Sequence, residues 1–148
     1  MNRATQAVLF SSDKIDWETP QSLFDELDKH HHSTKWTGIS PQRKTDCRRT
    51  WEGETVFCNP PYGNKETGLW TKKCFEEAQK PGTTVVLLIP ARTDRASFHE
   101  YIYNKLGVSV RFLRGRLTFE VDGELMRDKK GSIANAPFPS MIVEFKCT

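Results

Sequence analysis

Residues 54–63 read Glu-Thr-Val-Phe-Cys-Asn-Pro-Pro-Tyr-Gly, and this stretch decides the fold class. The apolar run that ends at Cys58 is short, as expected for a buried strand. The strand stops at Asn59-Pro60-Pro61, because proline has no backbone N–H to donate and does not continue a central strand. The sequence therefore predicts a buried strand that ends in a rigid turn.

Strand and helix patterns alternate on both sides of this turn. The run Thr83–Ile89 (Thr-Thr-Val-Val-Leu-Leu-Ile) is typical of a strand buried on both faces of a parallel sheet. The remaining expected elements are helices over 20–29 and 67–79, a helix capped by Thr93 or Asp94 with Phe98, Tyr101, Ile102 and Leu106 inward, a strand over 108–113, and an antiparallel pair over 116–121 and 140–145. This alternation predicts an open α/β sheet.

Two loops follow strands of this sheet, Asn59–Tyr62 and Pro90–Asp94. Ligands of open α/β sheets bind outside the carboxyl ends of the strands. We therefore expect both loops to border the functional site.

The stretch from His30 to Trp51 lacks apolar periodicity and is dense in His, Lys, Arg, Ser and Thr. We expect an irregular segment over 30–50 and a loose polar arm over 1–16, within one domain that spans 1–148. The three adjacent histidines 30–32 predict no metal site, because neighbouring side chains on a helix point to different faces and no Cys or carboxylate pattern accompanies them.

Composition limits the class of protein. The 148 residues carry a net charge of +3 and 28% charged residues, with a pI near 8.7, which fits a soluble domain and allows a polyanionic partner. The four cysteines form no CxxC pair, so we expect reduced thiols rather than disulfides or a zinc site. Since no apolar run approaches the roughly 20 residues of a membrane span and the start lacks a signal-peptide pattern, we expect a cytoplasmic protein with no membrane contact.

The Asn59–Tyr62 turn combines hydrogen-bond acceptors with an aromatic ring, as a site that binds an amino group on a base would need. An exocyclic amine on adenine is a weak nucleophile, since its lone pair is delocalised into the ring. Two acceptors, the Asn59 side-chain oxygen and the Pro60 carbonyl, would draw that lone pair towards a methyl donor, and the two prolines would hold them rigidly. Tyr62 offers a flat face for an unstacked base. The alternative is a rigid turn with no catalytic role.

The chain resembles the phage-encoded DNA N6-adenine methyltransferase family, whose members carry an Asn-Pro-Pro-Tyr motif. The resemblance covers about 12–29 and 51–146, and its landmarks stand in the same order: Asp16-Trp17-Glu18-Thr19-Pro20, Leu23-Phe24, Asn59-Pro60-Pro61-Tyr62-Gly63, Pro90-Ala91-Arg92-Thr93-Asp94, Phe98-His99, Gly115-Arg116-Leu117 and Ala136-Pro137-Phe138-Pro139-Ser140. It implies a small Rossmann-like sheet, S-adenosylmethionine as cofactor and adenine in double-stranded DNA as substrate. It further implies a phage or prophage gene expressed in a bacterial host.

The resemblance assigns roles to particular residues. Asn59, Pro60, Pro61 and Tyr62 would be catalytic; Trp17, Thr19 and Pro20 would border the cofactor; Arg92 and Asp94 would lie beside the active-site cleft. Arg114 and Arg116, near a strand end, are candidate contacts to DNA phosphates, with a solvated face as the alternative. Arg92 and Asp94 are equally compatible with a helix start, Trp17 with a core anchor, and Phe138 with either a loop plug or a DNA contact. His99 is expected to be a packing or surface residue, and nothing in the sequence indicates an obligate protein partner.

The chain departs from the family pattern between the first helix and Asn59. The family has there a strand that ends in an acidic residue, within a motif like Leu-Asp-x-x-Ala, whereas Asp46 is the only acidic residue from His30 to Trp51. Three interpretations stay open: a divergent cofactor site, a remnant in a catalytically impaired DNA-binding relative that has lost the cofactor site, or a segment rewritten by compensating frameshifts. The sequence therefore predicts a sheet with an incomplete N-terminal half.

Overall fold

The computed structural model describes residues 18–30, 36–39, 48–63, 65–121 and 123–146. The chain divides into two compact units, the first made of residues 1–32 and 114–139, the second of residues 33–113 and 140–148. The single domain expected from the chain length stays a prediction. Of the helices in the described part of the chain, none is long and apolar enough to cross a membrane.

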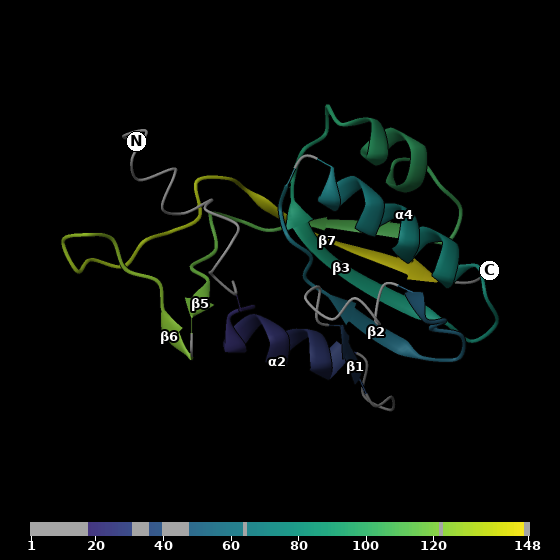
Figure 1. Cartoon of the computed structure of the whole chain (residues 1–148), viewed down its shortest axis with the longest axis horizontal. Helices are drawn as coiled ribbons and strands as arrows, with labels where there is room; N and C mark the ends of the chain where they lie inside the picture. The colour runs from purple at the N-terminus through teal and green to yellow at the C-terminus, as the bar shows by residue number, and fades with distance from the viewer. Residues whose placement is uncertain (1–17, 31–35, 40–47, 64, 122, 147–148) are drawn as a thin grey trace. The chain divides into compact units, whose positions relative to one another are not determined.

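The second unit contains a five-stranded mixed sheet (Figure 1). Its strands, in spatial order, are β1 (Trp36–Ile39), β2 (Thr55–Cys58), β3 (Thr84–Pro90), β7 (Ser140–Lys146) and β4 (Val108–Phe112). The first three are parallel, and β7 runs antiparallel to both β3 and β4. The predicted α/β class is confirmed at this level.

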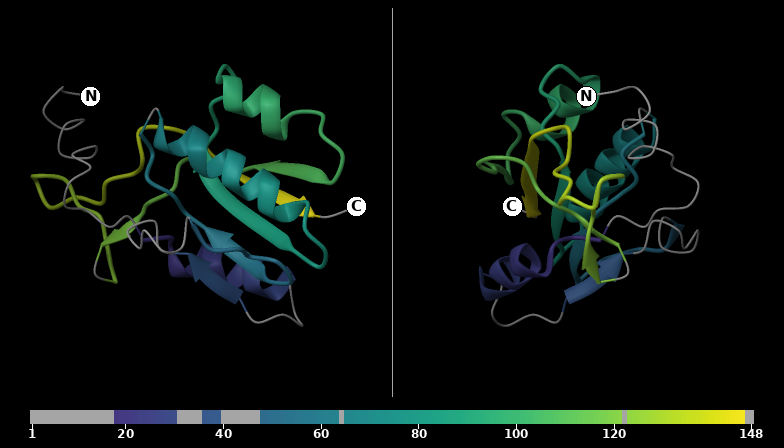
Figure 2. Two further views of the ribbon diagram at one scale, coloured as in Figure 1. Left: turned by 45° about the vertical axis from the view of Figure 1, so that its right-hand side comes forward. Right: turned by 90° about the vertical axis from the view of Figure 1, so that its left-hand side faces the viewer.

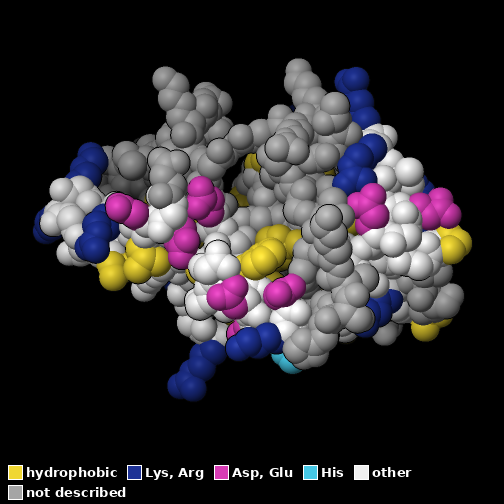
Figure 3. Space-filling view, turned by 90° about the horizontal axis from the view of Figure 1, so that it is seen from below, with side chains coloured by type: hydrophobic (Ala, Val, Ile, Leu, Met, Phe, Trp, Pro, Cys, Tyr) yellow, Lys and Arg dark blue, Asp and Glu magenta, His cyan; other side chains and the backbone are white. Residues whose placement is uncertain are grey.

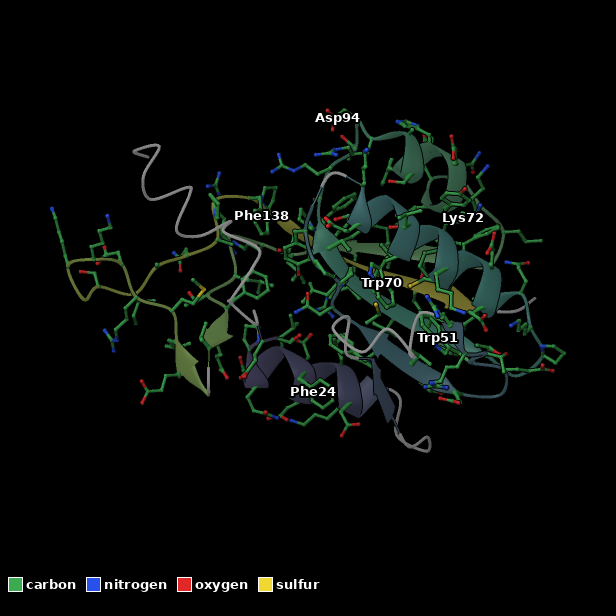
Figure 4. The ribbon with its side chains drawn as sticks, in the orientation of Figure 1. Phe24, Trp51, Trp70, Lys72, Asp94 and Phe138 are labelled. Carbon is green, nitrogen blue, oxygen red and sulfur yellow. The ribbon has the colours of Figure 1, made fainter. Side chains whose placement is uncertain are left out.

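Helix α4 (Glu66–Ala78) packs on one face of this sheet, as both views of Figure 2 show. It follows the Asn59–Tyr62 turn and leads into β3, so strand, turn, helix and strand are consecutive in sequence and adjacent in space. The core between helix and sheet contains the fully buried Val56, Val85 and Val143. Trp51 and Trp70 stack here with ring centroids 6.5 Å apart (Figure 4). The strand predicted to end at Cys58, the helix predicted over 67–79 and the strand predicted over 83–89 are confirmed within one residue at each end.

Strand β1 corrects one expectation, because the segment from His30 to Trp51 was predicted to contain no strand. Trp36–Ile39 pairs with β2 in parallel, with Trp36 beside Thr55 and Ile39 beside Cys58. Trp36-Thr37-Gly38-Ile39 does not alternate apolar with polar residues, so only the backbone pairing with β2 reveals the strand. Residues 40–47, where the acidic strand end of the family pattern is sought, lie outside the described residues.

The predicted pairing of 116–121 with 140–145 is wrong. Strand β7 pairs instead with β3 and β4, while β5 (Glu120–Val121) forms a separate two-stranded hairpin with β6 (Glu124–Leu125). The physical reason is burial: β7 is buried from Ser140 to Val143 between β3 and β4, whereas β5 is only half-buried. Adjacency in sequence suggested a hairpin, but the apolar β7 buries more of its surface between two strands than it would beside β5 alone.

The helix expected from Thr93 is shorter than predicted. Helical structure there covers residues 96–102. Its last part is the five-residue η1 (Phe98–Ile102), which closes a wide turn through the Tyr103 N–H bond to the Phe98 carbonyl. Phe98 and Ile102 are buried as expected, but Leu106 is 84% exposed. The chain turns away at Tyr103, whose backbone is extended, so Leu106 never completes the predicted helical face.

The first unit holds α2 (Gln21–His30), β5 and β6. Helix α2 buries Leu23 and Leu27, which confirms the short amphipathic helix predicted over 20–29. It begins at Gln21 rather than Pro20, because the Pro20 carbonyl accepts the first helical hydrogen bonds. Phe119 and Phe138 pack together in this unit with centroids 6.3 Å apart, both almost fully buried.

Candidate active site

The Asn59–Tyr62 turn leaves the carboxyl end of β2 at the edge of the sheet where parallel strands place their ligand sites. Pro60 is buried, Asn59 and Tyr62 are half-buried, and Pro61 is exposed. The turn is thus anchored at its centre and open on one side. This is the accessibility that a reacting group at a strand end needs.

Tyr62 and Asn59 are joined by a hydrogen bond within the turn. The Tyr62 hydroxyl donates to Asn59 Oδ1 at 2.5 Å and also lies 3.4 Å from the Leu88 carbonyl oxygen on β3. Burial of the hydroxyl, with a smaller contribution from the neighbouring Cys58 thiol, raises the pKa of Tyr62 well above its usual range. Tyr62 therefore stays a neutral hydrogen-bond donor at any physiological pH.

Helix α4 holds the other side of the turn. The Thr67 hydroxyl donates to the Pro61 carbonyl at 3.1 Å, and the Thr67 N–H donates to the Gly63 carbonyl at 3.2 Å. Gly63 leaves room for the Glu66 side chain, whose carboxylate folds back to where a Cβ at Gly63 would stand. The turn is consequently fixed both to the helix that follows it and to the strand beside it.

The loop after β3 ends at the same edge of the sheet. Arg92 and Asp94 are exposed in this loop, and Asp94 projects away from the sheet (Figure 4). The Thr93 carbonyl oxygen lies 2.8 Å from His99 Nε2, a bond that ties the loop to η1. His99 is exposed and packs edge-on against the Phe98 ring. It is thus an exposed residue that holds a loop.

The Asn-Pro-Pro-Tyr motif thus stands at the end of β2, beside its parallel neighbour β3. The model of the family described as DNA N-6-adenine-methyltransferase (Dam) matches residues 6–147, nearly the whole chain. The chain belongs to this Dam family. The resemblance seen in the sequence is confirmed. Comparison with individual curated proteins gives no match.

The Dam landmark before α2 lies in the first unit. Glu18 pairs with Glu120 of β5 through two backbone hydrogen bonds, and the Glu18 carboxylate accepts the Gly123 N–H. Thr19 is half-buried and Pro20 buried directly after this pairing. Trp17, the third residue predicted to border the cofactor, lies outside the described residues. The roles of all three stay predictions.

Two further Dam landmarks also fall in the first unit. Arg114 and Arg116 are both exposed beside Gly115, so they are accessible to a phosphate, although their predicted role stays untested. Phe138 is 1% exposed against Phe119. A side chain buried to this extent fills the interior, which favours the loop plug over the DNA contact.

Several contacts of the site carried no sequence signal. Thr67 belongs to no motif, and its bond to Pro61 depends on where α4 begins. The bond between Tyr62 and Asn59 joins two motif residues whose individual roles had been assigned separately. Within the described ranges, no three His, Cys, Asp or Glu residues are grouped as a metal site would need, and Cys58 and Cys74 are buried free thiols.

Proposed function

We propose that this Dam-family chain transfers a methyl group from S-adenosylmethionine to the N6 amine of an adenine flipped out of double-stranded DNA. The observation that carries the proposal is the turn at the end of β2, where the Asn59 side-chain oxygen and the rigid Pro60-Pro61 backbone stand at an open sheet edge. Family membership supplies the chemical context. The proposal includes a Rossmann-like sheet, for which the parallel β1–β2–β3 order is the support.

The Asn59 and Pro60 oxygens would act on the amine. Each accepts one of its two hydrogens, which localises the nitrogen lone pair so that it can form the new bond to carbon. Because the turn is already tied down by Thr67 and Tyr62, these acceptors need little rearrangement when the base arrives. The amine proton leaves after the bond forms, so the site needs no strong base.

Tyr62 would hold the flipped base. Its ring is half-buried, packed against the core on one side, and its hydroxyl is directed into the protein. A ring fixed at both ends offers a stable surface for stacking, which contributes roughly 1–3 kcal/mol per base. Stacking also offsets part of the cost of removing the base from the duplex.

Thr19 and Pro20, with Trp17, are proposed to border the methyl donor. The Glu18–Glu120 pairing fixes the position of Thr19 and Pro20 beside β5, which is compatible with a wall for a nucleoside-like ligand. When bound, S-adenosylmethionine supplies the methyl group. Arg92, Asp94, Arg114 and Arg116 are proposed to contact DNA, since all four are exposed.

The test is methylation of duplex DNA with labelled S-adenosylmethionine by the full chain, followed by identification of the labelled base. We expect N6-methyladenine as the product. Asn59→Ala removes the side-chain acceptor and is expected to lower kcat by at least roughly 100-fold, in the range seen when one preorganised polar group is lost from an active site.

Asn59→Asp is the matched control, because it keeps an acceptor oxygen at the same place and should retain far more activity than Asn59→Ala. The melting temperatures of both variants should stay close to that of the wild type, since Asn59 is only half-buried. Label in N4-methylcytosine or in protein would overturn the substrate assignment, and equal turnover by wild type and Asn59→Ala would overturn the role of Asn59.

A further inference from the structure

Residues 127–133 of the first unit follow β6 and form a hydrogen-bonded loop, the tip. A single bridge between Arg127 and Ile133 closes this tip, and the Ala134 N–H donates to the Met126 carbonyl at its base. All seven residues of the tip are exposed. Its order therefore does not come from burial in a core.

Hydrogen bonds within the tip account for its order. The Asp128 carboxylate accepts the backbone N–H groups of Lys130 and Ser132 at 2.8 and 3.0 Å, and the Asp128 N–H donates to the Ser132 carbonyl at 2.8 Å. Arg127 donates to the Gly131 carbonyl at 2.8 Å. Gly131 has a φ of +82°, a conformation that other residues rarely adopt, and it completes the turn.

Because of these hydrogen bonds, the positive charges of the tip are more exposed than its negative charge. The Asp128 carboxylate is directed inward at backbone donors, whereas Lys129 and Lys130 stand exposed at the apex. Among the described side chains, neither lysine forms an ion pair with an acidic residue. Figure 3 shows Lys and Arg side chains projecting at this end of the unit, at the left of the view. The backbone that carries the two lysines is thus held by hydrogen bonds within the tip.

We propose that this tip grips the phosphate backbone of duplex DNA, with Lys129 and Lys130 as the contacting cations. The inference rests on the proposed function and adds to it where the DNA is held. A rigid basic tip is complementary to a polyanion, and its fixed form avoids the ordering cost that a flexible loop would incur on binding. A contact from lysine to a phosphate carries no sequence information, so a tip that contacts only phosphates positions the duplex without selecting its sequence.

The decisive measurement is the affinity of the full chain for duplex DNA between 50 and 200 mM salt, without added cofactor. For the double variant Lys129→Gln/Lys130→Gln we expect weaker binding to every duplex tested. The slope of log affinity against log salt should become less negative by about 2, close to 1 for each lost phosphate contact. The control Lys72→Gln/Lys105→Gln removes the same charge from exposed lysines of the second unit and should change the slope by less than half as much.

The variant Asp128→Ala distinguishes the effect of an ordered tip on DNA binding from the effect of net charge. The substitution makes the chain more positive, so a simple charge effect predicts tighter binding to DNA. Because the side chain that orders the tip is lost, we expect weaker binding instead. Tighter binding, or a Lys129/Lys130 variant that behaves like its control, overturns the inference, and a loss confined to one DNA sequence overturns the assignment to phosphates.

The outcomes also distinguish this inference from the proposed function. If the wild-type chain binds and methylates DNA and the tip variants bind DNA equally well, the inference about the tip is refuted and the proposed function stands. A folded wild-type chain that binds no duplex DNA refutes both. The substitutions lie on an exposed tip, so they should leave the melting temperature nearly unchanged, and a melting scan checks this.

Discussion

The hydroxyl of Tyr62 ends beside the one side-chain oxygen that the proposed chemistry needs. A carbonyl oxygen has two lone pairs, so Asn59 Oδ1 can accept from the Tyr62 hydroxyl and still accept from an amine. The phenol would then act twice: its ring as a surface for the base, and its hydroxyl as the group that orients the amide. These two roles are separable by substitution.

Tyr62→Phe keeps the ring and removes the hydroxyl. We expect kcat to fall about 2- to 10-fold, the equivalent of one ordinary hydrogen bond, with little change in KM. Tyr62→Ala also loses the stacking surface, worth roughly 1–3 kcal/mol, and should raise KM for DNA in addition. Steady-state kinetics of the two variants test this, and a Tyr62→Phe enzyme as impaired as Tyr62→Ala would contradict separate roles.

At the scale of the elements, the buried carboxylate of Glu77 links helix α4 to the chain segment before β2. Glu77 accepts hydrogen bonds from the Trp51 N–H at 2.8 Å and from Lys73 and Lys80 at 2.7 and 2.8 Å. Burial by itself would raise the pKa of Glu77, but these bonds, above all those from the two lysines, outweigh it and lower the pKa to about 2. The helix that holds the Asn59–Tyr62 turn thus depends on an ionised side chain.

The lowered pKa predicts how stability depends on pH. Because Glu77 binds a proton less readily when folded than when unfolded, its contribution is fully present above about pH 4.5 and is lost as pH falls towards 2. We expect Glu77→Gln to lower the free energy of unfolding by on the order of 1–3 kcal/mol at pH 7, with the difference shrinking on acidification.

Urea unfolding of wild type and Glu77→Gln from pH 7 to pH 3 measures this difference. Glu76→Gln is the matched control, since Glu76 is exposed on the same helix and its contact with Lys72 is 3.9 Å long. Surface pairs of this kind contribute little, so the control should change stability by less than about 1 kcal/mol. A Glu77→Gln effect independent of pH would contradict the assignment.

At the scale of the whole molecule, the family match extends over both units. It spans residues 6–147, so the landmarks around Thr19 in the first unit and around Asn59 in the second belong to one family pattern. The catalytically impaired relative differs from the proposed enzyme in a single property of the whole chain, the binding of S-adenosylmethionine. That property is measurable without turnover.

S-adenosylmethionine at 100 times its Kd should stabilise the folded chain by about 2.7 kcal/mol. For a chain of this length the melting temperature would rise by roughly 5–10 °C. A thermal melt with and without the cofactor measures the shift, and adenosine serves as the control for non-specific nucleoside binding. A folded chain that binds DNA but shows no shift would favour the impaired relative.

By itself the sequence determined the features that depend on local pattern: the strand that ends at Cys58, helix α4, the buried strand β3, and the ordered motifs of the Dam family. Apolar periodicity and the effect of proline act over a few residues, so the elements that depend on them can be predicted from the sequence alone. Strand β1, the place of β7 between β3 and β4, and the bonds of Tyr62 and Thr67 were decided only by the tertiary structure. All these features join residues that are brought together by the pairing and packing of the whole sheet. A short or exposed segment has no pattern in its own sequence that identifies its partner.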